Sequence, residues 1–299
     1  MSIVTNFQAV PNRLFCIFAA VAESENGLLR DQLESWATPP SLSRRGANDE
    51  DGGTTELFSN SLAEARRLGL IEDDGERLRV PLRADTSARR KSDLEADFLS
   101  RVREVIFDPQ RAAAAGQAGV LYALAWFLTK NPLQPVSFSD APQEQLRKDL
   151  GEFAAKADLG STSSFQNLLY WARYLGFATV AGDGGTRRAF PDPTRAIGTV
   201  LDQILVINEW IEIDVFLSRL AGIYPVLEGG VVREELESMR SAPPATDDRL
   251  SIASSLALQR LVDRGSILLD TLADAKKARI LDFGSTTKRV SHVQIGATK

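Results

Sequence analysis

The chain has 299 residues, of which 43% are hydrophobic and 25% are charged, a composition that suits a globular protein of two or three domains. Its formal net charge of -5 excludes bulk electrostatic attraction to nucleic acid, so any DNA contact must come from local basic patches. The single cysteine, Cys16, excludes an internal disulfide, and with only one histidine, His292, a zinc site is not expected.

The N-terminus lacks a basic region followed by an apolar run, which argues against a signal peptide. The longest apolar run, near residues 119–128, has about ten residues, whereas a bilayer span needs about 20. We therefore expect a cytoplasmic protein with no membrane partner. The sequence also lacks a phosphate-binding loop, a dinucleotide-binding glycine motif and a serine nucleophile elbow, so we predict a non-enzymatic protein with no cofactor, metal or catalytic residue.

Residues 1–82 are predicted to form a first winged-helix module. Three helices are expected, at residues 12–22, 28–36 and 53–70. Apolar side chains recur at helical spacing along one face of the third helix, at Phe58, Leu62, Ala65 and Leu68. Gly69 supplies the positive φ that ends this helix, and strands at residues 70–71 and 78–80 then enclose a turn. Three helices followed by a β-hairpin is the winged-helix order, in which the third helix usually enters a DNA groove.

The third helix and its glycine recur 107 residues later, at residues 160–177. Seven positions are identical between the copies: Phe58/Phe165, Asn60/Asn167, Leu62/Leu169, Ala65/Ala172, Arg66/Arg173, Leu68/Leu175 and Gly69/Gly176. The same offset places Leu14 and Phe15 on Leu121 and Tyr122. A constant offset across some 55 residues indicates duplication of a whole module.

The predicted fold is therefore mainly α with short β-hairpins, an α+β protein of tandem winged-helix (helix-turn-helix) modules. Its segments are module 1 (1–82), a polar linker with an amphipathic connecting helix (83–115), module 2 (116–195), a helical region with a degenerate third module (196–290) and a tail (291–299). In the third module we expect apolar helix over residues 197–220, second and third helices at 231–239 and 251–264, and wing strands at 267–269 and 280–283. The last ten residues are expected to be disordered or to add an edge strand.

The third helix of module 2 begins with residues that can bond to phosphate or to base edges: Ser161, Thr162, Ser163, Ser164, Gln166 and Asn167. Arg187 and Arg188 lie on the predicted wing and can reach phosphate. We predict duplex DNA contact here; the alternative is an ordinary helix cap and a solvated hairpin. Most aromatic side chains of this helix are expected in the core, with one exposed ring available to an interface.

Module 1 has the same frame but opposite charge. Glu56 and Glu64 lie on its third helix and would repel phosphate. Its wing is predicted to contact protein rather than DNA, or to be a solvated turn, because four acids surround it: Glu72, Asp73, Asp74 and Glu76.

The start of the chain, Ser2-Ile3-Val4 followed by Pro11 and Arg13-Leu14, together with the tandem modules and the total length, resembles the DpdG proteins. Those proteins are encoded in gene islands that insert 7-deazaguanine derivatives into DNA and restrict unmodified DNA. The resemblance covers the whole chain and implies an accessory component of restriction, working beside an ATPase or nuclease supplied by partner subunits. It carries no functional motif, so no site residue follows from it.

Three functions remain open at this stage. The first is a DNA-binding subunit of a DNA-modification and restriction complex. The second is a protein scaffold whose modules recruit partner subunits without touching DNA, which the acidic charge favours. The third is a transcriptional regulator that dimerises through the helices at residues 94–107 or 197–220. The oligomeric state does not follow from the sequence.

Overall fold

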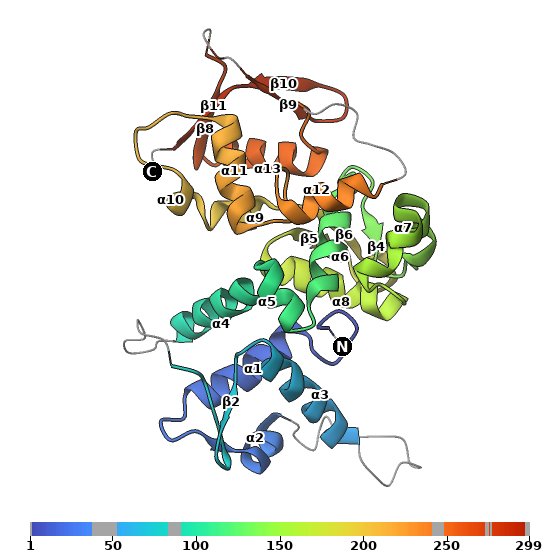
Figure 1. Ribbon diagram of the computed structural model, residues 1–299, viewed down its shortest axis with the longest axis vertical. Helices are drawn as coiled ribbons and strands as arrows, with labels where there is room; N and C mark the ends of the chain where they lie inside the picture. The colour runs from blue at the N-terminus through green and yellow to red at the C-terminus, as the bar shows by residue number, and fades with distance from the viewer. Residues whose placement is uncertain are drawn as a thin grey trace. The chain divides into compact units, whose positions relative to one another are not determined.

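The computed structural model describes residues 2–37, 53–82, 91–240, 248–272, 275 and 277–296. These residues are mainly helical, with small antiparallel sheets of short strands, so the predicted class of mainly α with short β is confirmed. The chain forms two compact units, Met1–Ala118 and Gly119–Lys299 (Figure 1). Among the described residues, no helix has both the length and the apolar character needed to cross a membrane.

The first unit begins with a helix, a strand, two helices and a hairpin. These elements are α1 (Pro11–Ala22), β1 (Leu28–Leu29), α2 (Arg30–Ala37), α3 (Gly53–Arg67), β2 (Glu72–Asp74) and β3 (Arg77–Arg79). The sheet order is β1-β3-β2, with both pairings antiparallel. The first hairpin strand starts two residues later than predicted, because Leu70 and Ile71 are buried in the core instead of pairing in the sheet.

The predicted apolar face of α3 is confirmed, since Phe58, Leu62, Ala65 and Leu68 are each at most 1% exposed. Gly69 has a φ of +62°, the left-handed conformation expected where the helix ends. The second helix differs in part from the prediction. Leu28 and Leu29 pair with β3 as a strand, so α2 starts at Arg30.

Two further helices, α4 (Lys91–Ile106) and α5 (Pro109–Ala114), complete the first unit. Phe98 of α4 packs against Phe15 and Phe18 of α1, with ring centroids 5.6 Å apart in each pair. The apolar face of α4 is thus buried within its own unit, which leaves it unavailable as a dimer seam. Most of the linker predicted before α4, residues 83–90, lies outside the described residues.

The second unit starts with the same order of elements as the first. These are α6 (Ala118–Leu128), β4 (Val136–Ser137), α7 (Gln143–Leu150), α8 (Thr162–Leu175), β5 (Ala178–Ala181) and β6 (Arg188–Pro191). Two 3₁₀ helices are added to this order: η1 (Gly151–Ala157) follows α7, and η2 (Gly184–Thr186) lies between β5 and β6. The sheet order β4-β6-β5 reproduces the order β1-β3-β2 of the first unit. Gly176 ends α8 with a φ of +95°, the equivalent of Gly69 after α3.

The rest of the unit comprises α9 (Thr194–Gly198), α10 (Leu201–Ile204), β7 (Ile211–Glu212), α11 (Ile213–Ile223), α12 (Val231–Ser238), α13 (Ile252–Asp263), β8 (Ile267–Asp270), β9 (Arg279–Asp282), β10 (Thr287–Val290) and β11 (His292–Ile295). Helices form near residues 231–239 and 251–264, as predicted. The predicted helical region 197–220 is instead broken by a non-helical stretch and by β7.

The prediction that residues 267–269 and 280–283 pair as the wing of this third region is wrong. Strand β9, within the expected wing, pairs with β10 as a separate hairpin. The partner of β8 is β11, which lies between β7 and β8 and comes from residues expected to be a tail or an edge strand. The helices of this region also differ from the prediction, which gave the second-helix position to residues 231–239. Helix α11 directly follows β7, as α2 follows β1, so α11 has the second-helix position and α12 is an additional helix.

Candidate nucleic-acid interface

One side of α8 is exposed and carries no acid. Ser163, Gln166, Tyr170 and Arg173 follow one another at intervals of three, four and three residues, so they share one helix face. Ser163, Tyr170 and Arg173 are exposed, and Gln166 is half-buried. The opposite face is buried, with Trp171 and Leu175 fully inaccessible. We call the four residues of this stripe, with Arg187 and Arg188 of the adjoining hairpin, the α8 face.

The first turn of α8 is closed by its own serines. Ser161 Oγ accepts from the Ser164 amide at 3.1 Å, and Ser164 Oγ accepts from the Ser161 amide at 3.0 Å, a reciprocal capping box. Ser164 and Asn167 are 4% and 2% exposed, so these two predicted DNA contacts do not face solvent. Ser161 and Ser163 are exposed, and Thr162 is half-buried. Gln166 Nε2 donates to the Phe138 carbonyl oxygen at 2.9 Å.

The hairpin arginines are brought to the same surface. The Arg187 guanidinium lies 5.2 Å from the centre of the Phe138 ring, and its Nη1 donates to the Tyr170 hydroxyl at 3.1 Å. Arg188 Nη1 donates to Ser137 Oγ at 3.2 Å. Tyr170 is the exposed aromatic ring expected on this helix, and it joins the hairpin to α8. Sequence reasoning placed these arginines on a wing but did not find the contact of Arg187 with Tyr170.

The cations of the α8 face have no acidic partner within the described part of the chain. Arg173, Arg187 and Arg188 form no ion pair there, and the nearest hairpin acid in sequence, Asp183, caps η2 through Thr186. Arg195, just beyond, donates to the backbone carbonyls of Arg173 and Tyr174 at the end of α8. Unpaired guanidinium groups keep their full charge for an anionic ligand such as phosphate.

Two arginines of the first unit, Arg66 and Arg79, are paired with acids, whereas Arg77, which has the sheet position of Arg188, donates to the Gly27 carbonyl oxygen at 3.1 Å. Arg66 pairs with Asp73, and Arg79 Nε lies 2.8 Å from Asp74 Oδ2. The four acids predicted for protein contact, Glu72, Asp73, Asp74 and Glu76, are all exposed on or beside β2. The two hairpins thus differ in the state of their charges as well as in their sign.

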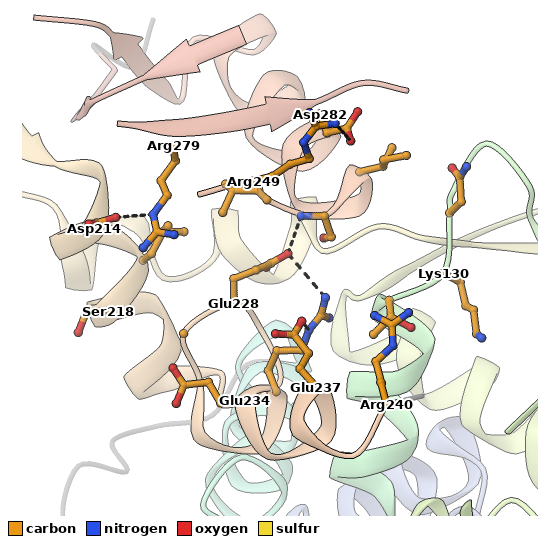
Figure 2. Close-up of a pocket in the computed structure, with 18 residues that line it drawn as sticks. Lys130, Asp214, Ser218, Glu228, Glu234, Glu237, Arg240, Arg249, Arg279 and Asp282 are labelled. Atoms are coloured by element: carbon orange, nitrogen blue, oxygen red, sulfur yellow. Dashed lines mark hydrogen bonds and ion pairs between the residues drawn. The ribbon is translucent and has the colours of Figure 1, made fainter. Parts of the chain in front are cut away.

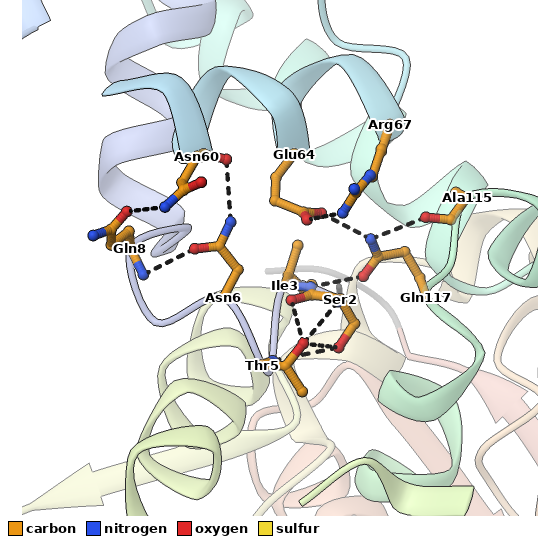
Figure 3. Close-up of polar contacts among 10 residues, drawn as sticks. All are labelled: Ser2, Ile3, Thr5, Asn6, Gln8, Asn60, Glu64, Arg67, Ala115 and Gln117. Atoms are coloured by element: carbon orange, nitrogen blue, oxygen red, sulfur yellow. Dashed lines mark hydrogen bonds and ion pairs between the residues drawn. The ribbon is translucent and has the colours of Figure 1, made fainter. Parts of the chain in front are cut away.

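The expectation that Glu64 repels phosphate is wrong, because its side chain is buried. Glu64 Oε1 lies 2.6 Å from Arg67 Nη1, and its Oε2 accepts from Gln117 Nε2 at 3.0 Å (Figure 3). Gln117, itself fully buried, also accepts from the Ile3 amide at 2.8 Å. Glu64 of α3 is therefore linked to the N-terminal segment through Gln117. Glu56, at the start of α3, is exposed.

The family of the chain is decided by a direct match. A family model described as DpdG-like matches residues 1–275, most of the 299-residue chain. The chain belongs to the DpdG-like family. The predicted resemblance is thereby confirmed, and membership suggests a role in the Dpd 7-deazaguanine modification system. No curated protein and no solved structure matches the chain.

The DpdG-like protein also has a charged cleft of about 670 Å³ in its second unit, which sequence reasoning missed (Figure 2). Its lining charges are largely paired with one another. Arg279 Nε lies 2.6 Å from Asp214 Oδ1, and Arg249 Nη1 lies 3.0 Å from Asp282 Oδ2. Acidic and basic lining residues are equal in number, so the cleft has no net charge to attract an ion. The Arg233 and Glu237 pair at helical spacing was the one signal of it in the sequence.

A carboxylate occupies the start of α13 in the DpdG-like protein. Glu228 accepts from the Ser251 amide at 3.1 Å and from Ser254 Oγ at 2.6 Å, with Arg233 at 4.0 Å. Burial alone would raise the pKa of Glu228, but Arg233 and these hydrogen bonds outweigh it and hold the pKa below its ordinary value. The hydrogen-bond donors at the start of α13 are therefore satisfied within the protein by Glu228.

Proposed function

We propose that this DpdG-like protein is a non-enzymatic, DNA-binding accessory subunit of a 7-deazaguanine DNA-modification and restriction system. We propose further that the two repeated arrangements are winged-helix modules and that module 2 makes the DNA contact. The observation that carries the proposal is the α8 face, where Arg173, Arg187 and Arg188 meet an exposed helix side without acids or ion-pair partners in the described residues.

The arrangement of elements supports this choice. In winged-helix and helix-turn-helix proteins, one helix enters the major groove while flanking elements contact the backbone. In this proposal α8 takes the role of that helix, and the β5–β6 hairpin that carries Arg187 and Arg188 follows it in the chain. Tyr170 and Phe138 hold Arg187 in place, so less side-chain freedom is lost when it binds an anion.

The net charge sets the conditions of binding. A protein of net charge -5 is repelled by DNA at long range, so contact depends on a few local cations and is salt-sensitive. Each phosphate neutralised contributes about -0.9 to the slope of log K against log salt. We expect binding at low ionic strength and a large loss between about 50 and 200 mM salt.

The test is fluorescence anisotropy with the full-length protein and a labelled duplex at low salt. Arg187→Glu with Arg188→Glu is expected to weaken binding by about tenfold or more, through two lost phosphate contacts and added repulsion. Lys288→Glu with Arg289→Glu is the matched control, since both residues are exposed on β10 and the charge change is the same. Absence of any binding at low salt, or equal loss in both double variants, would refute the proposal.

A second candidate function rests on module 1. Its hairpin exposes Glu72 and Glu76, which form no ion pair with any described residue, beside the paired Asp73 and Asp74. We propose that a basic surface of a partner subunit contacts this hairpin. Failure of the DNA experiment, together with recovery of a stoichiometric partner after nuclease treatment of a native lysate, would favour this scaffold function over the first.

A further inference from the structure

Sequence readout by a groove-binding helix requires particular groups at particular places. The residues near the start of the helix contact base edges, and discrimination comes chiefly from Arg to guanine and from Asn or Gln to adenine. A helix whose early amides and guanidinium groups are absent or engaged elsewhere can hold the duplex but cannot distinguish its bases.

The early amides of α8 are engaged within the protein. Asn167 is 2% exposed and faces the core. Gln166 is half-buried, and its Nε2 is committed to the Phe138 carbonyl oxygen at 2.9 Å, which turns the amide toward the protein. A bidentate contact with adenine needs the nitrogen and the oxygen of one side-chain amide together. The bond to Phe138 occupies the nitrogen of Gln166, so this amide cannot make the bidentate contact.

The early hydroxyls discriminate little. Ser161 and Ser164 bond to each other's backbone amides in the capping box. Ser163 is exposed and Thr162 half-buried, but serine and threonine hydroxyls bond to either kind of base partner and to phosphate.

The arginines lie where backbone contact is expected. Arg173 is in the last turn of α8, two residues before its end at Leu175. Arg187 and Arg188 lie on the hairpin, and Arg187 is fixed by the Tyr170 hydroxyl and the Phe138 ring. Arg173 and Arg187 therefore lie away from the first turn of the helix, which is the part that would face the bases.

Resting on the proposed function, we infer that the α8 face binds duplex DNA through its phosphates and does not discriminate base sequence. The substrate of this site is the duplex backbone in general. Target choice within a restriction complex must then come from another surface or subunit.

The experiment measures the Kd of the full-length protein at low salt for three duplexes of equal length: all A·T, all G·C and mixed. We expect the three Kd values to agree within about threefold, since each specific base contact would add about five- to 150-fold. Arg187→Ala is expected to weaken binding to all three by a similar factor and to reduce the salt slope by about 1. Gln166→Ala and Ser163→Ala are expected to change the Kd values of all three duplexes by the same factor, so that the ratios between them stay within about twofold.

A preference above about tenfold for one duplex that Gln166→Ala or Ser163→Ala removes would overturn the inference while leaving the proposed function intact. A loss with Arg187→Ala confined to G·C duplexes would also overturn it, because it would show guanine readout. Failure to bind any duplex would instead refute the proposed function. A thermal melt of each variant verifies that altered binding does not reflect unfolding.

Discussion

The buried contact between Gln117 and Glu64 makes a sharp test of how the first unit is held together. Gln117 accepts from the Ile3 amide and donates to Glu64, so it bridges the N-terminal segment and α3. The substitution Gln117→Glu is nearly isosteric. It keeps the oxygen that accepts from Ile3 but replaces the donor nitrogen, 3.0 Å from Glu64 Oε2, by an oxygen.

The expected magnitude follows from two competing costs. Two carboxylates 3 Å apart repel by about 5 to 6 kcal/mol at an effective dielectric constant of about 20. Protonating the introduced carboxyl at pH 7 costs about 3.7 kcal/mol, given an ordinary pKa of about 4.3 and 1.36 kcal/mol per pH unit. Protonation of the introduced carboxyl costs less than the repulsion, so this carboxyl should be protonated in the folded state. The free energy of unfolding should therefore fall by about 3 to 4 kcal/mol at pH 7.

The sign of the pH dependence is fixed by the same argument. The protonated carboxyl can donate to Glu64 as the amide did, and the neighbouring carboxylate raises its pKa in the folded state. The deficit is therefore largest above the unfolded pKa and shrinks as pH falls toward it, to less than about 1 kcal/mol near pH 4. This is the reverse of a carboxylate stabilised by folding.

The assay compares urea unfolding of variant and parent at pH 7 and near pH 4, with hydrogen exchange of residues 2–9 as a local measure. Gln110→Glu on α5 is the control, because the same chemical change there is exposed and should cost under about 0.5 kcal/mol at both pH values. A deficit below about 1 kcal/mol at pH 7, or one that does not shrink in acid, would refute the reasoning.

Two further predictions concern the second unit and the repeat. Glu228→Gln should lower the free energy of unfolding by about 1 to 3 kcal/mol at pH 7. Folding lowers the pKa of Glu228, so its contribution to stability is present above the unfolded pKa of about 4.3 and is lost as the pH falls below that value. The acid denaturation curves of parent and variant should therefore converge. Gly176→Ala should destabilise by at least about 1 kcal/mol more than Gly69→Ala in thermal melts, since both glycines have positive φ but only at Gly176 would a Cβ meet backbone, 2.9 Å from the Ala196 nitrogen; equal losses would contradict this.

The repeat was the most informative part of the sequence. Its constant offset predicted that α3 and α8 would end alike, and Gly69 and Gly176 both adopt positive φ after a buried apolar face. Pairing in the third region was not predictable in this way. Strand β11 consists of only four residues, His292–Ile295, and its partner β8 is separated from it by the β9–β10 hairpin. Short strands joined over a long separation leave little local signal, so the prediction chose the nearer segment.

At the candidate site, residue type was predictable and side-chain engagement was not. The Ser/Thr/Gln/Asn start of α8 looks the same whether its groups face solvent or the protein, yet Ser164 and Asn167 are buried. Glu64 was misjudged for the same reason, because Gln117, its partner, is 53 residues away in the sequence. Hydrogen bonds of that separation depend on tertiary packing, which periodicity along one helix does not reveal.

The two copies share a framework of buried residues but differ in the charge that they expose. The residues shared between α3 and α8 are mainly apolar and fix the helix against its core, so they constrain the position of the exposed face but not its chemistry. At the shared arginine, Arg66 is drawn to Asp73 of its own hairpin, whereas Arg173 meets no acid among the described residues. An internal ion pair on the surface contributes little to stability but lowers the charge offered to an outside anion. Asp73 of the first hairpin thus reduces the charge that Arg66 offers to an outside anion, whereas Arg173 of the second copy keeps its charge available.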